Sequence, residues 1–315
     1  MKHAPRFCLP LCLLLLLTAL ALLPALSGCG ADTGTASAAE AASVQGGDTA
    51  AGMPRDAGSA SGDRVIHLGF TTVWGGLNPY FTTAGTMYEL SLYDKLYDRL
   101  VFTDMAGAEI LPRAAADWES RDGGRTAVFH LDPDARWADG EAVTARDWVF
   151  TVALLADPDC AFSTRVFTGT LAGTDADGAA LPGETLGAEA PDDATLVFHF
   201  KEPMSVEDFL LHYNRRFFVL PAHLLEGVAP SEILDAPYWQ HPIGSGPCVY
   251  ASQVLGAEME LTRNPCYPRG EANWDRLVLQ AVDSSSRLTA LMSGEIDQSV
   301  PAFCPSGSGT ISPPL

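Results

Sequence analysis

The chain has 315 residues, with 19 basic and 39 acidic side chains and a formal net charge of −20. This length leaves room for one large or two ordinary domains with a substantial core. Nucleic acids and anionic lipid surfaces reward clustered cations, so the acidic balance argues against both as partners. An acidic surface instead suits a soluble protein outside the cytoplasm.

Residues 1–28 have the pattern of a secretory signal, because a short basic start precedes the almost entirely apolar stretch Phe7–Ala25. Without this segment the chain keeps 17 basic and 39 acidic side chains, a net charge of −22. The ending Leu26-Ser27-Gly28-Cys29 resembles a lipobox. We expect a lipoprotein signal peptide over 1–28 and a diacylglyceryl anchor on Cys29, each buried CH₂ contributing about 0.8 kcal/mol. The alternative is an ordinary signal peptide with a coincidental cysteine.

Residues 29–63 form a segment in which Gly, Ala, Ser and Thr dominate and large apolar side chains are nearly absent. Such a composition cannot bury enough surface to offset the entropy that ordering would cost. We therefore expect a flexible, lipid-anchored linker that leads to a folded body beginning near Arg64.

The stretch Leu111–Thr151 predicts a hairpin, a polar turn and a helix. Apolar and polar residues alternate in Trp118–Ser120 and Thr126–Leu131, and the glycines of Arg121–Gly124 permit the turn between them. Thr144 stands three residues before Asp147, as in a capping box, and an apolar helical face follows.

Along the rest of the body, the same alternation and spacing rules predict further elements. Residues 161–193, rich in Gly, Ala and Asp, are expected to form a surface excursion. The predicted elements are a strand at Arg64–Phe70, a helix at Met87–Leu100, a strand at Thr195–Phe200, a helix at Val206–Tyr213, a hairpin of Cys248–Val254 with Glu258–Arg263 about Gly256, a strand at Arg276–Val282 and a helix at Ser286–Ser293.

An ordered set of motifs resembles the family 5 extracellular solute-binding proteins, the oligopeptide and dipeptide receptors of ABC importers. The resemblance spans Arg64–Asp297. The motifs are Pro112, Trp118-Glu119, Asp122-Gly123, Phe129-His130-Leu131, Trp137-Ala138-Asp139-Gly140, Thr144–Phe150, Lys201-Glu202-Pro203, Pro221-Ala222-His223, Ile243–Pro247, Asn264–Tyr267 and Leu291–Asp297.

The resemblance implies an α/β, two-lobed type II periplasmic-binding-protein fold. Residues 64–270 would form a nearly complete first lobe, 271–297 the start of a truncated second lobe, and 298–315 an aberrant or disordered tail. It also implies a monomer that captures a peptide ligand in the cleft between the lobes and delivers it to an ABC permease complex. No enzyme activity, cofactor or metal is expected.

The resemblance places the ligand cleft at the loop after the first strand and at the start of the following helix. On this basis Trp74, Thr86, Met87 and Tyr88 are the predicted ligand-binding residues, because aromatic faces suit a peptide that is held without close reading of its sequence. The alternative assigns Trp74 and Tyr88 to the core. Asn78-Pro79 is interpreted as turn chemistry.

Two positions depart from the family pattern: Cys248 replaces a Tyr after Gly-Pro, and Pro268 replaces a Trp after Asn-Pro-x-Tyr. Counting outward from the hairpin turn would place Cys248 opposite Cys266. An oxidising compartment would then permit a disulfide across the hairpin, and the alternative is two unpaired thiols.

The residues after Asp297 lose the family pattern, so we expect a truncated chain that folds marginally and binds peptide poorly. Other hypotheses stay open. The ligand could be nickel, haem or another small solute. The chain could be a secreted hydrolase with Asp117/Glu119 or Asp139/Glu141 as its carboxylate pair. A gene remnant without function is a further alternative. His223 is predicted to open a short helix and not to bind a metal.

Overall fold

The computed structural model describes residues 63–70, 76–81, 87–103, 109–162, 165–269 and 273–299. All of them belong to the unit Gly58–Leu315. The signal segment, Cys29 and nearly all of the predicted linker lie outside the described residues. Among the helices that are described, none is long and apolar enough to cross a membrane.

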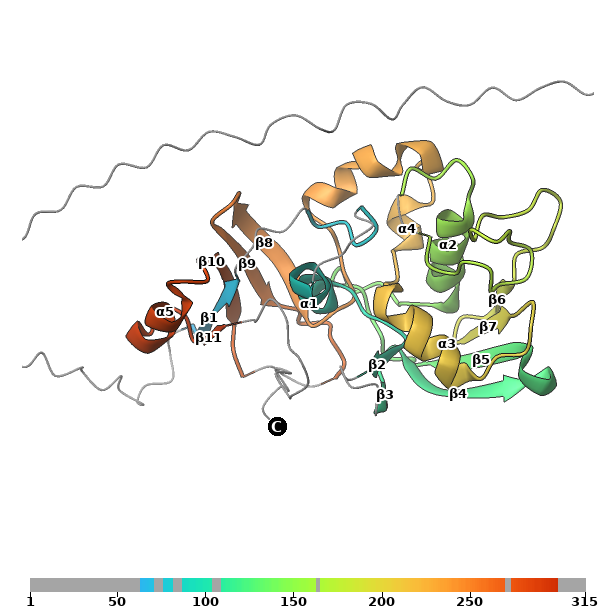
Figure 1. The fold of residues 1–315 in the computed structure, drawn as a ribbon, viewed down its shortest axis with the longest axis horizontal. Coiled ribbons are helices and arrows are strands. Elements are labelled where there is room, and N and C mark those ends of the chain that lie inside the picture. Colours follow the sequence, from blue (N-terminus) through green and yellow to red (C-terminus); the bar gives the residue numbers. More distant parts are fainter. Residues whose placement is uncertain are drawn as a thin grey trace, which may run out of the picture. The chain divides into compact units, whose positions relative to one another are not determined.

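A five-stranded mixed sheet joins the first and last described strands (Figure 1). β1 pairs in parallel with β10 on one side and with β11 on the other. β9 is antiparallel to both β10 and β8. The strand order is β11 (Gln298–Ser299), β1 (Val65–Phe70), β10 (Arg276–Ala281), β9 (Glu258–Arg263) and β8 (Cys248–Val254).

Two segments of this sheet fall within regions that the sequence assigned outside the first lobe. β10 was expected to start a second lobe at residue 271, but it lies between β1 and β9 in one sheet. Residues 298–299 were assigned to an aberrant tail, but they form β11. The Asp297 N–H donates to the His67 carbonyl at 2.8 Å, and the Asp297 carboxylate accepts the His67 N–H at 2.9 Å. These bonds direct the chain along β1.

A second sheet of four antiparallel strands contains the predicted hairpin. Its order is β4 (Ala115–Arg121), β5 (Thr126–Leu131), β7 (Thr195–His199) and β6 (Ala188–Asp192). The β4–β5 turn confirms the prediction from Arg121–Gly124, because Gly123 and Gly124 have φ of 65° and 91°. Alternate residues of β5 and β7 face the core, where Phe129 and Phe198 lie 5.9 Å apart between ring centres.

Helices α2 (Ala145–Ala156) and α3 (Val206–Tyr213) pack against this second sheet (Figure 1). The predicted capping box is confirmed, since the Asp147 carboxylate accepts the Thr144 N–H at 2.8 Å. Asp147 also accepts the Ala222 N–H at 2.9 Å, which fixes α4 (Ala222–Leu225) to the start of α2. His223 therefore opens a short helix, as predicted.

The remaining elements are short. They are α1 (Met87–Leu96), β2 (Val101–Thr103), β3 (Ile110–Pro112) and α5 (Arg287–Ser293), with 3-10 turns at Asp122–Gly124, Asn214–Arg216, Pro230–Asp235 and Pro237–Gln240.

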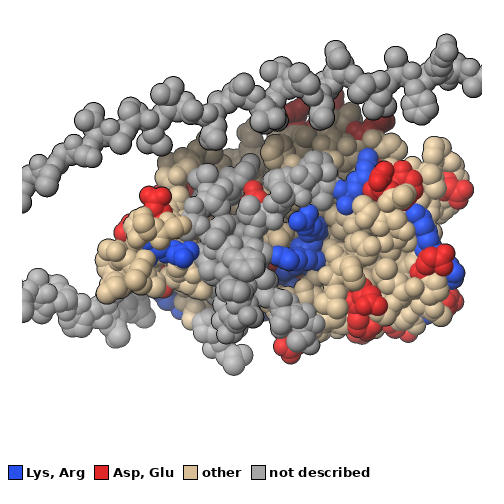
Figure 2. Space-filling view, viewed as in Figure 1, with Lys and Arg blue, Asp and Glu red and all other residues tan. Residues whose placement is uncertain are grey.

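Charged side chains of both signs lie on the face in Figure 2, where one group of cations lies near the middle.

Candidate functional site

The candidate ligand site lies where the parallel strands of the five-stranded sheet end. Phe70 of β1 is opposite Ala281 of β10, and Gly69 is opposite Ser299 of β11. The Ala281 N–H donates to the Ala257 carbonyl at 2.8 Å, so the β8–β9 turn reaches the same edge. Ligands of open α/β sheets bind beyond the carboxyl ends of the strands. This edge is therefore the place to expect a ligand.

The predicted ligand residues belong to the connection from this edge to α1 and to the first turn of that helix. Trp74 and Thr86 lie outside the described residues. Met87 and Tyr88 are the first two residues of α1, and only their place in the helix is described. All four assignments stay predictions.

The described part of this connection, residues 76–81, is fixed along α1 by tyrosine hydroxyls. Tyr97 donates to the Leu77 carbonyl at 2.9 Å, and Tyr93 donates to the Gly76 carbonyl at 3.3 Å. The Asn78 side chain accepts the Tyr80 N–H at 2.9 Å, which confirms turn chemistry for Asn78-Pro79. The loop that leads to the predicted ligand residues is thus anchored by buried groups.

The other end of α1 contacts a turn that contains two glycines. The Gly246 N–H donates to the Leu96 carbonyl at 3.0 Å, and Ser245 Oγ accepts the Asp98 N–H at 3.1 Å. A Cβ atom on Gly244 would lie 1.8 Å from the Leu96 oxygen, so only glycine permits this approach. The contact also explains why the helix predicted to reach Leu100 ends at Leu96.

Two more of the family-like motifs meet this turn. Asn264 donates its side-chain N–H to the Gly246 carbonyl at 2.8 Å. The Ala138 N–H donates to the Gly244 carbonyl at 2.9 Å, which places the Trp137–Gly140 turn there as well. Motifs more than a hundred residues apart therefore build one contact, which we name the α1 joint (Leu96, Asp98, Ala138, Gly244–Pro247 and Asn264). Sequence reasoning gave no signal that they converge.

Beside the α1 joint lies a group of ion pairs that sequence reasoning also missed. Asp98 is 2% exposed and contacts the guanidinium groups of Arg113 and Arg269, each at 2.7 Å. Burial opposes the charge of Arg113, but Asp98 raises its pKa above the ordinary value. We name the set the arginine–aspartate cluster: Asp94, Asp98, Arg99, Arg113, Asp132 and Arg269.

The predicted disulfide is not formed in this structure, where Cys248 and Cys266 are both free. Cys248 is opposite Arg263 in the hairpin, because β9 ends there and Asn264 turns the chain. The Asn264 side chain accepts the Cys266 N–H at 2.9 Å, and the Cys266 sulfur lies 3.9 Å from the Ala138 carbonyl oxygen. Burial raises the pKa of the Cys248 thiol to about 12.

The carboxylates of the hydrolase hypothesis have structural contacts. Asp139 accepts the Glu141 N–H at 3.2 Å within a turn, and its other oxygen lies 3.0 Å from His223 Nε2. Asp117 and Glu119 lie on one solvent-facing side of β4, where Arg121 pairs with Glu119. Among the described residues, no three His, Cys, Asp or Glu side chains gather into a metal site.

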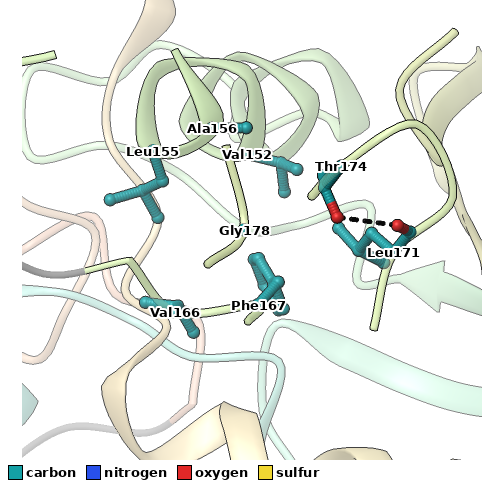
Figure 3. A pocket seen from close by; sticks show the side chains of 8 residues that line it. All are labelled: Val152, Leu155, Ala156, Val166, Phe167, Leu171, Thr174 and Gly178. Carbon is teal, nitrogen blue, oxygen red and sulfur yellow. Dashed lines mark hydrogen bonds between the residues drawn. The ribbon is translucent and has the colours of Figure 1, made fainter. Parts of the chain in front are cut away.

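A recess beside α2 has the wrong properties for a ligand site (Figure 3). Val152 and Leu155 of α2 face Phe167 across it, and Thr174 donates to the Leu171 carbonyl at 2.8 Å. Its empty volume, open mouth included, is about 190 Å³, without room for a water-sized sphere. We interpret it as a packing gap in the core.

Comparison with known proteins identifies the family. The family model for bacterial extracellular solute-binding proteins, family 5 Middle, matches residues 109–306. The chain belongs to this family. Family 5 proteins are binding proteins for transport, so the prediction that the chain is not an enzyme is confirmed.

Matches to individual relatives support the assignment of this chain to family 5. The periplasmic oligopeptide-binding protein OppA of Haemophilus influenzae is 31% identical over 177 residues, which are 55% of this chain and 31% of OppA. Its solved complex with the peptide RPPGFSPFR matches at 25% identity with a TM-score of 0.62, covering 75% of this chain and 45% of that one. An ABC transporter substrate-binding protein of Listeria monocytogenes, CtaP, matches at 26% identity with a TM-score of 0.61, covering 75% and 44%.

These matches confirm the predicted fold class, a mixed α/β structure that corresponds to part of a two-lobed binding protein. The chain spans less than half the length of the relatives that it matches. The periplasmic relatives also support an extracytoplasmic location.

Proposed function

We propose that this family 5 protein is the substrate-binding lipoprotein of an ABC transporter, which captures peptides in a cleft between two lobes and delivers them, as a monomer, to a membrane permease. The observation that carries the proposal is the family match together with the solved relative that holds the peptide RPPGFSPFR.

The described geometry is compatible with this role. The carboxyl ends of β1, β10 and β11 meet at one edge, and the chain that leaves β1 there leads to α1. Trp74 and Thr86 belong to this connection and Met87 and Tyr88 begin α1, and we propose that all four contact the ligand. Aromatic side chains gain much of their contact energy from their faces, so peptides of different sequence can share such a site.

Peptide titration tests the ligand assignment. The purified full chain is titrated with RPPGFSPFR by calorimetry, next to the variants Trp74→Ala and Leu211→Ala; Leu211 is a control on α3, 42% exposed. We expect saturable binding, because the solved relative that holds this peptide matches the fold of this chain. Trp74→Ala should weaken it about two- to tenfold, the equivalent of losing one aromatic contact.

Three outcomes would count against this assignment. Equal affinities of wild type and Trp74→Ala would remove Trp74 from the site. No binding of peptide at all, with saturable binding of nickel or haem in the same assay, would replace the ligand class. No binding of either would leave this chain without the proposed receptor function.

A separate experiment tests the lipid anchor. Bacteria that express the wild-type gene or Cys29→Ser are grown with an alkyne fatty acid, and the chain is examined for label and for its membrane fraction. We expect label and membrane retention in the wild type and loss of both in Cys29→Ser. Retention of the label in Cys29→Ser would place the modification elsewhere and refute the lipobox assignment.

A further inference from the structure

The arginine–aspartate cluster connects α1 with both sheets. Asp98 lies two residues after α1, Arg113 lies two residues before β4, Asp132 follows β5, and Arg269 lies six residues after β9. The cluster therefore joins three parts of the fold at the place where the chain passes between them.

Arg269 has contacts with all of these parts. Its guanidinium lies 2.7 Å from the Asp98 carboxylate and 3.6 Å from the Asp132 carboxylate. It also donates to the Arg113 carbonyl, and its cationic carbon lies 5.3 Å from the centre of the Tyr267 ring. The planar guanidinium can serve several acceptors at once in fixed directions, which a lysine ammonium cannot.

These ion pairs can hold the paired side chains in fixed positions, because the central carboxylate of Asp98 is almost inaccessible to solvent. Asp98 is 2% exposed, and the side chains of Arg113 and Arg269 are 12% and 23% exposed. The cluster has three carboxylates and three guanidinium groups, so its charges balance as a set. Removal of one cation would leave a buried carboxylate with incomplete compensation.

We propose that Arg269 is a positioning residue, which ties the C-terminal end of α1 to the segments that flank the five-stranded and the four-stranded sheet, and thereby sets the position of the Met87–Tyr88 end of that helix. α1 is ten residues long, and its contacts with the α1 joint and the cluster are at its C-terminal end. A change of direction at that end displaces the first turn the most. The effect on ligand affinity rests on the proposed function, whereas the effect on α1 does not.

Hydrogen–deuterium exchange of the full chain tests this role in Arg269→Gln, Arg269→Lys and Arg146→Gln. Arg146 pairs with Glu226 on the surface, with side chains 68% and 60% exposed, and is the matched control. We expect the α1 amides of Arg269→Gln to exchange at least about tenfold faster, since a lost hydrogen bond to a buried charge shifts a local equilibrium by this order. Amides of β5 should be unchanged, Arg269→Lys intermediate and Arg146→Gln like wild type.

Two results would overturn the proposal. Unchanged exchange in α1 of Arg269→Gln would show that the contacts do not hold the helix. An equal increase in α1 and β5 would assign Arg269 to general stability and not to positioning. Titration with RPPGFSPFR follows on the same samples, where Arg269→Gln should bind more weakly than Arg146→Gln. If the wild type binds no peptide, the proposed function fails for this chain, while the exchange result still decides the role of Arg269.

Discussion

Among the positions of the α1 joint, Gly244 should be the one where an added methyl group lowers the free energy of unfolding most. An added Cβ would lie 1.8 Å from the Leu96 oxygen, whereas real Cβ atoms stay at 3.0 Å or more from such neighbours. In Gly244→Ala the turn must therefore retreat by at least about 1.2 Å. Backbone lies on both sides of the contact, so no flexible side chain can move aside.

The size of the effect follows from what the retreat disrupts. The hydrogen bonds from the Gly246 N–H to the Leu96 carbonyl (3.0 Å) and from the Asp98 N–H to Ser245 Oγ (3.1 Å) would both lengthen beyond useful range. Each contributes about 1 kcal/mol, and overpacking adds about 1–3 kcal/mol. We expect a loss of about 3–5 kcal/mol in the free energy of unfolding, or about 6–20 °C in Tm for a domain of this size.

Thermal unfolding followed by far-UV circular dichroism measures this loss, and Gly227→Ala is its control. Gly227 is exposed after α4, has no atom within 4 Å of the added Cβ and has no positive φ. Gly227→Ala should stay within about 0.5 kcal/mol of wild type. If Gly244→Ala unfolds at the same temperature as Gly227→Ala, the close approach to Leu96 does not exist in solution and the joint is wrong.

Two further predictions concern cysteines and acid. Cys248 is 1% exposed, and its burial raises the thiol pKa to about 12. Iodoacetamide should therefore alkylate Cys266 in the native chain and Cys248 only after unfolding, which peptide mass mapping measures. A linked Cys248–Cys266 peptide in the absence of reductant would contradict the structure. The Ala194 N–H donates to the Asp192 carboxylate and lowers its pKa. The stabilisation of the fold by this hydrogen bond is therefore present above about pH 4 and is lost as the pH falls through the pKa of Asp192 in the folded chain. Asp192→Asn should lower Tm at pH 6, and the Tm difference from wild type should shrink as the pH falls below about 4; a constant Tm difference would refute the assignment.

The sequence by itself determined the elements whose decisive interactions lie within a few residues. The capping box joins Thr144 to Asp147, the β4–β5 turn depends on Gly123 and Gly124, and the β8–β9 hairpin turns at Gly256. In each case the residue type and its nearest neighbours fix the backbone, so a local pattern is sufficient. The ordered motifs also gave the family, because their types and spacing are specific.

The tertiary structure decided everything that depends on distant partners. Parallel pairing of β1 with β10 joins residues more than two hundred positions apart. The end of β9 at Arg263 separated the two cysteines that counting had paired. The α1 joint and the arginine–aspartate cluster could not be predicted either. A close backbone approach and a buried charge balance depend on packing in three dimensions, which leaves no periodic signal in the chain.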